Sequence, residues 1–161
     1  MDTQTLTQLI DTAWENRSSI NSSTSGETRE AIEYVVKGLD SGQYRVCEKS
    51  GSDWVVNQWL KKAVLMSFRL NDSTVIASGL KYGEMGDAPW FDKVPSKFSG
   101  WTQDDYTQAS FRAVPNCVVR RGSYVASNVV LMPSFTNIGA YVDSGTMIDS
   151  YVTVGTSAHN G

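Results

Sequence analysis

The last third of the chain repeats a six-residue pattern of apolar and small positions. Three consecutive units begin at Val142, Ile148 and Val154. Each opens with an aliphatic residue, continues with Asp or Gly, and has Thr, Val or Ala four positions after the opener. The frame extends backwards, more loosely, to units that begin at Val130 and Thr136. This period predicts a parallel β-helix, in which the aliphatic residue points into a narrow core and Asp or Gly occupies the turn.

The pattern stops at Asn160, where the next aliphatic residue is expected. A solenoid buries each coil against its neighbours and needs a capped end. No helix, charged strand or proline follows Asn160 to cover the last edge. We therefore expect the chain to represent the front part of a longer protein. A real protein with a small, poorly capped repeat is the alternative.

The first seventy residues combine helix and strand patterns. Apolar residues recur at helical spacing in three stretches, which are residues 2–16, 32–39 and 60–68. Gly42 provides a C-terminal stop for the second of these helices. Two strand-like runs flank the turn residues 50–53 and predict a β-hairpin over residues 44–58. Residues 1–70 are therefore expected to form a compact α+β domain.

Residues 71–116 are predicted to be a loop-rich connector with one short helix. Thr102 and Asp105 have the spacing of a capping box, which predicts a helix over residues 103–109. A long connection of this kind is usually functional or a linker, and we interpret it as lid-like. Residues 117–161 are then expected to form the first coils of the β-helix.

Composition excludes several function classes. The net charge of −3 gives no bulk attraction for a polyanion, so we expect no nucleic-acid partner. No stretch approaches the length of a membrane span, and the N-terminus lacks the pattern of a secretory signal. The two cysteines, Cys47 and Cys117, match neither a metal site nor a disulfide framework. The cytoplasm is the location that these observations fit best.

Residue types for covalent catalysis are scarce. The one histidine, His159, excludes a Ser-His-Asp triad or a His-based metal site within this chain alone. Some hexapeptide acyltransferases use a histidine as a base, but His159 occupies an outward position of the last unit, and a surface role is the simpler interpretation. Neither Cys47 nor Cys117 has the cationic surroundings of a reactive thiol.

Arg112 and Asp149 are the stronger candidates. Arg112 lies at the junction of connector and repeat, where its guanidinium can bind a substrate carboxylate or form a structural ion pair. Asp149 can hold an amine and take its proton, but Asp143 occupies the same turn position, so position does not distinguish them. Arg120 and Arg121 can meet phosphates of a nucleotide-bearing donor, although solvated charges are the default interpretation.

Five segments carry a family pattern: residues 46–49, 58–69, 91–98, 111–115 and 130–149. Together they resemble tetrahydrodipicolinate N-succinyltransferase, over essentially the whole chain. The last segment, which contains Thr-Met-Ile-Asp149, is highly specific. The match corresponds to that enzyme's N-terminal domain, connector and first coils, while its remaining coils and C-terminal segment have no counterpart here.

The resemblance implies a homotrimeric enzyme with a left-handed β-helix, in the succinylase route to diaminopimelate and lysine. Such enzymes move a succinyl group from the co-substrate succinyl-CoA to the amine of ring-opened tetrahydrodipicolinate, without a bound cofactor or metal. The family's substrate-binding arginine matches Arg112 in Phe-Arg-x-Val-Pro, and its substrate-binding aspartate matches Asp149. The resemblance therefore gives the reason to prefer Asp149 over Asp143. Because later coils supply much of the CoA contact in the family, a chain ending at Gly161 is expected to show negligible turnover.

Two alternatives stay open at this point. The chain is equally compatible with a non-enzymatic module that assembles with, or regulates, a full-length partner. It is also compatible with a paralogue that acylates a related amino-dicarboxylate, in which case residues 78–89 are one place where specificity could differ.

Overall fold

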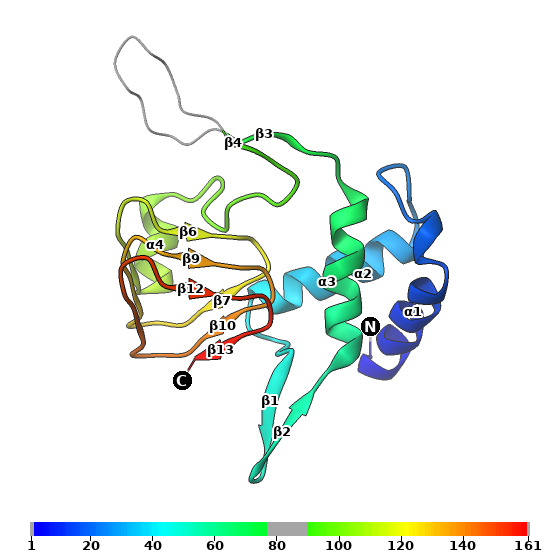
Figure 1. The fold of residues 1–161 in the computed structure, drawn as a ribbon, viewed down its shortest axis with the longest axis horizontal. Helices are drawn as coiled ribbons and strands as arrows, with labels where there is room; N and C mark the ends of the chain where they lie inside the picture. Colours follow the sequence, from blue (N-terminus) through cyan, green and yellow to red (C-terminus); the bar gives the residue numbers. More distant parts are fainter. Residues whose placement is uncertain (1, 77–89, 161) are drawn as a thin grey trace.

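The computed structural model describes residues 2–76 and 90–160 of the chain, and the segment 78–89 named above lies outside this described part. The N-terminal region, residues 2–76, is built on three α-helices and a short 3₁₀ helix (Figure 1). Their bounds are α1 Thr3–Glu15, η1 Arg17–Ser19, α2 Glu27–Asp40 and α3 Gln58–Leu70. The three helices predicted from periodicity are therefore present. None of the described helices is long and apolar enough to cross a membrane.

The N-terminal helices share one apolar core. Asp2 caps α1 by accepting a hydrogen bond from the backbone N–H of Thr5, at 2.9 Å. One face of each helix is buried, and burial of these side chains is the main stabilising contribution. The largest fully buried side chains that the helices contribute to this core are Leu6, Ile10, Ile32, Leu60, Met66 and Leu70.

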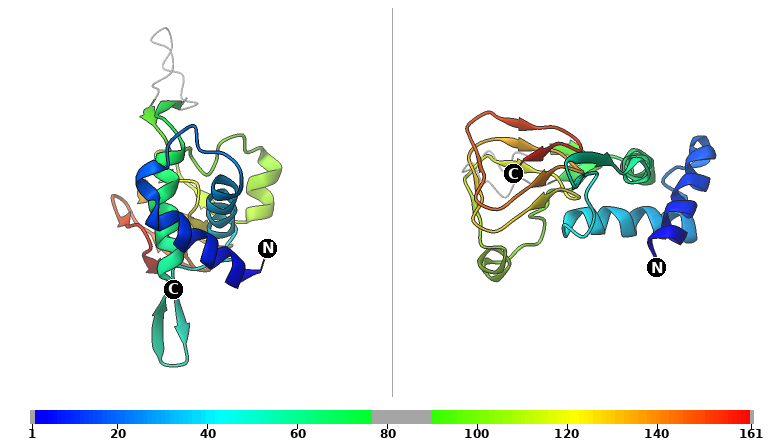
Figure 2. Two further views of the ribbon diagram at one scale, coloured as in Figure 1. Left: turned by 90° about the vertical axis from the view of Figure 1, so that its right-hand side faces the viewer. Right: turned by 90° about the horizontal axis from the view of Figure 1, so that it is seen from below.

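Two antiparallel hairpins accompany the helices. β1 (Cys47–Ser50) pairs with β2 (Asp53–Val56) and projects from the body of the molecule (Figures 1 and 2), as the turn signal predicted. β3 (Thr74–Ile76) pairs with β4 (Trp90–Asp92), a hairpin that the sequence analysis did not predict. The predicted short helix is present as α4 (Gln103–Ala109), with the capping box of Thr102 and Asp105 formed.

The rest of the described chain is a column of nine two-residue strands. They are β5 Arg112–Ala113, β6 Val118–Val119, β7 Tyr124–Val125, β8 Val130–Leu131, β9 Phe135–Thr136, β10 Tyr141–Val142, β11 Met147–Ile148, β12 Thr153–Val154 and β13 His159–Asn160. Every third strand pairs in parallel with the next, which gives the sheets β5-β8-β11, β6-β9-β12 and β7-β10-β13. Three sheets wound in this order form the three sides of a prism, and the coils have a triangular outline from below (Figure 2). This is the start of the predicted parallel β-helix.

The prism interior explains the repeat and corrects its frame. The second residue of each strand points inward. Five consecutive inward residues are buried, namely Val125, Leu131, Thr136, Val142 and Ile148. The inward residue of β8 is Leu131, not the predicted opener Val130, because the unit that follows it has five residues instead of six. The parallel strands also begin at Arg112, before the predicted boundary at residue 117, because the opening strand has a small inward Ala113 and no aliphatic signal. At the other end, β13 forms although Asn160 replaces the aliphatic residue.

One side of the prism is covered by the N-terminal region. Tyr124, Tyr141 and His159 point outward from neighbouring strands of the sheet β7-β10-β13 and stack on one another, with ring centroids 4.6 and 5.0 Å apart. Arg45 lies over the Tyr141 ring at 3.5 Å, and Trp54 packs edge-on against His159. The sheet β5-β8-β11 does not take part in this packing. Its outward residues Arg112 and Met147 are exposed, and Val130 between them is half-buried.

Candidate active site

Arg112 and Asp149 lie on the same side of the prism. Arg112 is the first residue of β5, and its partners in the sheet are Val130 of β8 and then Met147 of β11. Parallel strands are about 4.8 Å apart, so Arg112 and Met147 are separated by roughly 10 Å across the sheet. Asp149 follows Met147 by two residues, at the corner where β11 ends. The fold therefore brings both predicted site residues to one open face, although 37 positions separate them in the sequence.

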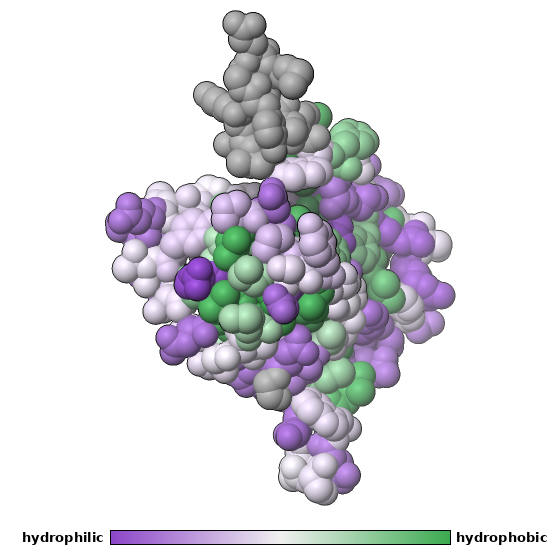
Figure 3. Space-filling view, turned by 60° about the vertical axis from the view of Figure 1, so that its left-hand side comes forward, coloured by the Kyte–Doolittle hydropathy of each residue, from purple (hydrophilic) through white to green (hydrophobic). Residues whose placement is uncertain are grey.

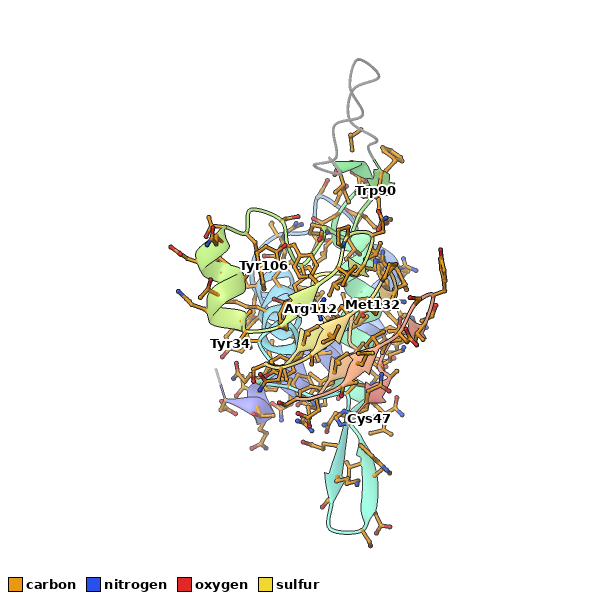
Figure 4. All side chains as sticks on the ribbon, turned by 90° about the vertical axis from the view of Figure 1, so that its left-hand side faces the viewer. Tyr34, Cys47, Trp90, Tyr106, Arg112 and Met132 are labelled. Carbon is orange, nitrogen blue, oxygen red and sulfur yellow. The ribbon has the colours of Figure 1, made fainter. Side chains whose placement is uncertain are left out.

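Arg112 is fixed at its backbone and exposed at its side chain. Its N–H donates to the carbonyl of Val129, at 2.9 Å, and the preceding Phe111 is buried against the coil interior. Within residues 2–76 and 90–160, the guanidinium makes no ion pair. The structural ion pair that the sequence left open is therefore not seen in the described part of the chain. Figure 4 shows Arg112 on this open face, near Met132.

Asp149 caps its own turn with only one carboxylate oxygen. Oδ1 accepts a hydrogen bond from the backbone N–H of Ser150, at 2.7 Å. Asp143 caps its turn in the same way, with Oδ1 at 2.8 Å from the N–H of Ser144. The two carboxylates differ in their remaining oxygen, because Oδ2 of Asp143 lies 3.6 Å from the guanidinium of Arg45. Asp149 has no such ion pair among the described residues, so its second oxygen is available to a ligand.

Three exposed apolar or aromatic residues lie close to Asp149 in the chain. Met147 is 61% exposed and Tyr151 is 92% exposed, and Val152 beside them is also exposed. Figure 3 shows hydrophobic side chains gathered over the coils on this side of the molecule. A carboxylate among apolar side chains interacts more strongly with a cation once another surface excludes water from it. The repeat pattern around Tyr151 gives no functional signal for this residue.

The face is open rather than enclosed. Two cavities of about 340 and 480 Å³ lie elsewhere, the first between the end of α2 and the first coil, the second beside the end of α3. Neither cavity is lined by Arg112 or Asp149. A ligand held by these two residues therefore needs a further wall from another surface.

Arg120 has a structural role, which corrects its interpretation as a solvated charge. Its guanidinium donates to Oδ2 of Asp92 at 2.8 Å and to Oδ1 of Asn137 at 3.0 Å, and it lies over the Phe68 ring. These contacts join the N-terminal region, the connector and the second coil. Arg121 is exposed.

Among the described residues, neither the two cysteines nor the histidine makes a side-chain hydrogen bond or ion pair with Arg112 or Asp149. Cys47 is half-buried in β1, as expected for a strand residue. Burial raises the pKa of the Cys117 thiol, which disfavours the reactive thiolate. Burial, and then the charge of Arg45, lower the pKa of His159, whose Nδ1 is enclosed without a hydrogen-bond partner in the described chain. Among the described residues, no three His, Cys, Asp or Glu side chains are grouped to hold a metal ion.

Comparison with known proteins supports one family. Residues 5–70 match the family model described as the tetrahydrodipicolinate N-succinyltransferase N-terminal domain. The chain is 55% identical, over 97% of its length, to 2,3,4,5-tetrahydropyridine-2,6-dicarboxylate N-succinyltransferase of Methylorubrum populi, and covers 54% of that protein. It is 53% identical to the enzymes of the same name from Caulobacter vibrioides and Parvibaculum lavamentivorans, over 94% and 100% of its length, covering 54% and 56% of them.

The expected resemblance to this family is confirmed. The similarity includes the N-terminal helices, the connector and the coils that hold Arg112 and Asp149, since the matches run over nearly the whole chain. The chain spans about half the length of the curated relatives it matches.

Proposed function

We propose that this chain is part of a tetrahydrodipicolinate N-succinyltransferase, which moves a succinyl group from succinyl-CoA to the amine of the ring-opened acceptor. The observation that carries the proposal is the shared open face of Arg112 and Asp149, with one oxygen of Asp149 available. The relatives that match this chain at 53–55% identity carry the name of this activity.

The two side chains suit different parts of an amino-dicarboxylate. The guanidinium of Arg112 offers paired N–H donors that match the geometry of a carboxylate. The free oxygen of Asp149 can accept a hydrogen bond from the acceptor's amine and hold that amine in orientation. The strands β5 and β11 are about 10 Å apart across the sheet. This distance is on the scale of a seven-carbon chain that is bound at both ends. Arg112 would therefore select the acceptor and Asp149 would position its reactive nitrogen.

The proposed reaction needs no covalent enzyme intermediate. The neutral amine attacks the thioester carbonyl, a C–N bond forms, and the tetrahedral intermediate expels the CoA thiolate. The proton lost from nitrogen passes to the carboxylate of Asp149 and then to solvent, while the thiolate takes a proton. This step depends on positioning, a proton acceptor and stabilisation of the oxyanion. The absence of a reactive-thiol environment at Cys117 agrees with such a direct transfer.

We further propose that the coils are left-handed and that three copies assemble, with a neighbouring surface closing the open face. Exposed Met147, Tyr151 and Val152 support the assembly, because apolar side chains around a binding residue favour cover by a partner. The enzyme is proposed to act in the cytoplasm, in lysine and diaminopimelate biosynthesis, without a bound cofactor.

The deciding experiment measures thiol release from succinyl-CoA by the intact protein purified from its own host. We expect release that depends on the tetrahydrodipicolinate acceptor, with one thiol formed for each acceptor consumed. Acceptor-independent hydrolysis alone, or no release, would contradict the proposal. A faster reaction with a different amino-dicarboxylate would instead identify the paralogue that the sequence left open.

A further inference from the structure

Seven of the eight corners that join consecutive strands of the prism share one backbone feature. Seven corner residues adopt a positive φ, between +59° and +87°, which is the left-handed region. Six of them are Gly, Asn or Ser, the small residues that tolerate this region best. The seven are Asn116, Gly122, Asn128, Gly139, Gly145, Tyr151 and Ser157.

Tyr151 is the single bulky residue at these seven corners, with φ of +61°. A left-handed conformation is a genuine outlier for a bulky side chain and raises the energy of the folded state. Packing within the described chain does not offset this cost, because the side chain of Tyr151 is 92% exposed. Its backbone N–H donates to the carbonyl of Pro133 at 2.7 Å, a bond that a residue with any side chain could make.

Tyr151 shares its turn with Asp149. The carbonyl of Asp149 accepts the N–H of Val152 at 3.2 Å, while its carboxylate caps Ser150. The four residues from 149 to 152 therefore form one closed turn, and the carboxylate and the phenol ring project from the same corner. The chain tolerates both backbone strain and an exposed ring at this one place. Local rules are most often broken in this way at functional sites.

We propose that Tyr151 is a recognition residue for the amino-dicarboxylate that binds at Asp149, an inference that rests on the proposed function. Its ring packs along the carbon chain of the ligand, and the ligand's amine meets the carboxylate of Asp149. Tyrosine suits this role, because it offers a large, rigid and partly polar contact area with few rotatable bonds. The left-handed backbone turns the ring away from the prism, toward the bound molecule.

The test combines affinity with stability in the intact protein. The probe is 2-aminopimelate, a saturated seven-carbon amino-dicarboxylate, and its Kd is measured by titration calorimetry. For Tyr151→Asn we expect Kd to rise about tenfold, while Tm rises because Asn suits the left-handed corner. Tyr151→Phe keeps the ring and should stay within about threefold of the wild-type Kd. The matched control Ser157→Asn changes the next left-handed corner and should leave Kd unchanged.

The possible results distinguish a wrong role for Tyr151 from a wrong proposed function. If the wild type binds 2-aminopimelate and Tyr151→Asn binds it equally well, the recognition role is wrong while the proposed function stands. A lower Tm in Tyr151→Asn would show that the ring stabilises the chain itself and would also overturn the role. A change of oligomeric state with unchanged Kd would assign the ring to a contact between copies. If the wild type neither binds 2-aminopimelate nor releases thiol, the proposed function itself is contradicted, and the role of Tyr151 that rests on it is contradicted as well.

Discussion

At the scale of single residues, the most informative contrast is between two aspartates in equivalent turns. Asp143 and Asp149 each cap the following N–H, but among the residues that the structure describes only Asp143 has an ion pair, with Arg45. The sequence pattern is the same for both. The difference arises because β10 belongs to the side of the prism that the N-terminal region covers, while β11 belongs to the open side.

This contrast gives a matched pair of variants. We expect Asp149→Asn to lower kcat by about 10²-fold or more, because an amide cannot accept the amine's proton. Asp143→Asn should leave kcat near wild type and lower the free energy of unfolding by less than about 1 kcal/mol, since its ion pair is half-exposed. Steady-state kinetics and urea unfolding measure the two effects. Wild-type turnover in Asp149→Asn would remove this residue from the site.

Arg112 is tested through affinity rather than turnover. Arg112→Lys replaces a fork of donors by a single ammonium, so we expect KM for the acceptor to rise about tenfold with kcat little changed. Arg121→Lys is the control, because Arg121 is exposed and lies outside the open face. An unchanged KM in Arg112→Lys would contradict the assigned role.

The buried hydroxyl of Thr136 allows a prediction about the free energy of unfolding. Thr136 is fully buried in the prism, and its Oγ1 has no hydrogen-bond partner in the described chain. Thr136→Val replaces the hydroxyl by a methyl of similar size and should raise the free energy of unfolding by up to about 1 kcal/mol. Thr136→Ser keeps the hydroxyl but removes a methyl, and should lower it by about 1 kcal/mol. Urea unfolding of both variants distinguishes these effects, and a stability loss in Thr136→Val would show that the hydroxyl is satisfied.

At the scale of elements, Lys97 is the contact that ties three parts of the chain together. Its ammonium, only 6% exposed, lies 3.1 Å from the carboxylate of Asp40 and donates to the carbonyls of Asp40 and Ser123, each at 3.0 Å. Asp40 in turn accepts the N–H of Gly122, at 2.7 Å. The end of α2, the connector and the first coil therefore meet at one buried ion pair. Burial lowers the pKa of Lys97, and the charge of Asp40 opposes that effect.

Loss of this ammonium should be costly. In Lys97→Met, Asp40 and two carbonyl groups lose a charged donor in a buried place, so we expect about 3 kcal/mol lower free energy of unfolding. Lys93→Met is the control, because within residues 2–76 and 90–160 Lys93 makes a single hydrogen bond, to the carbonyl of Phe68. Its loss should cost about 1 kcal/mol or less. Equal stability of the two variants in urea would show that the buried pair does not hold the elements together.

At the scale of the whole molecule, His159 reports on how the N-terminal region covers the coils. Its imidazole lies between Tyr141 of the second coil and Trp54 of the hairpin, with Arg45, Lys49 and Asp143 as the charges that act on it. Burial and the positive charge of Arg45 lower its pKa below the ordinary value, while Asp143 has the opposite effect. The packed arrangement therefore favours the neutral ring.

The sign of the pH effect follows from this shift. As pH falls through about 6.5, the unfolded chain binds a proton first, so the folded state loses stability until the lowered pKa is passed. We expect the urea midpoint of the wild type to fall more between pH 7.5 and pH 5 than that of His159→Gln. Because the sequence contains one histidine, its NMR titration gives the folded pKa directly. A folded pKa above 6.5 would contradict the predicted direction.

The sequence by itself determined the repeat, the three N-terminal helices, the β1–β2 hairpin and the capped helix α4, because each depends on local periodicity or turn chemistry. The resemblance to a family of succinyltransferases also needed only sequence. The β3–β4 hairpin, the five-residue unit after Leu131 and the structural role of Arg120 needed the fold, because they depend on pairing between distant segments. Tertiary structure alone decided that the N-terminal region covers the side β7-β10-β13, while Arg112 and Met147 on the side β5-β8-β11 stay exposed. Asp143 and Asp149 occupy the same position of the repeat, but a coil places them on different sides of the prism. Their carboxylates therefore meet different neighbours.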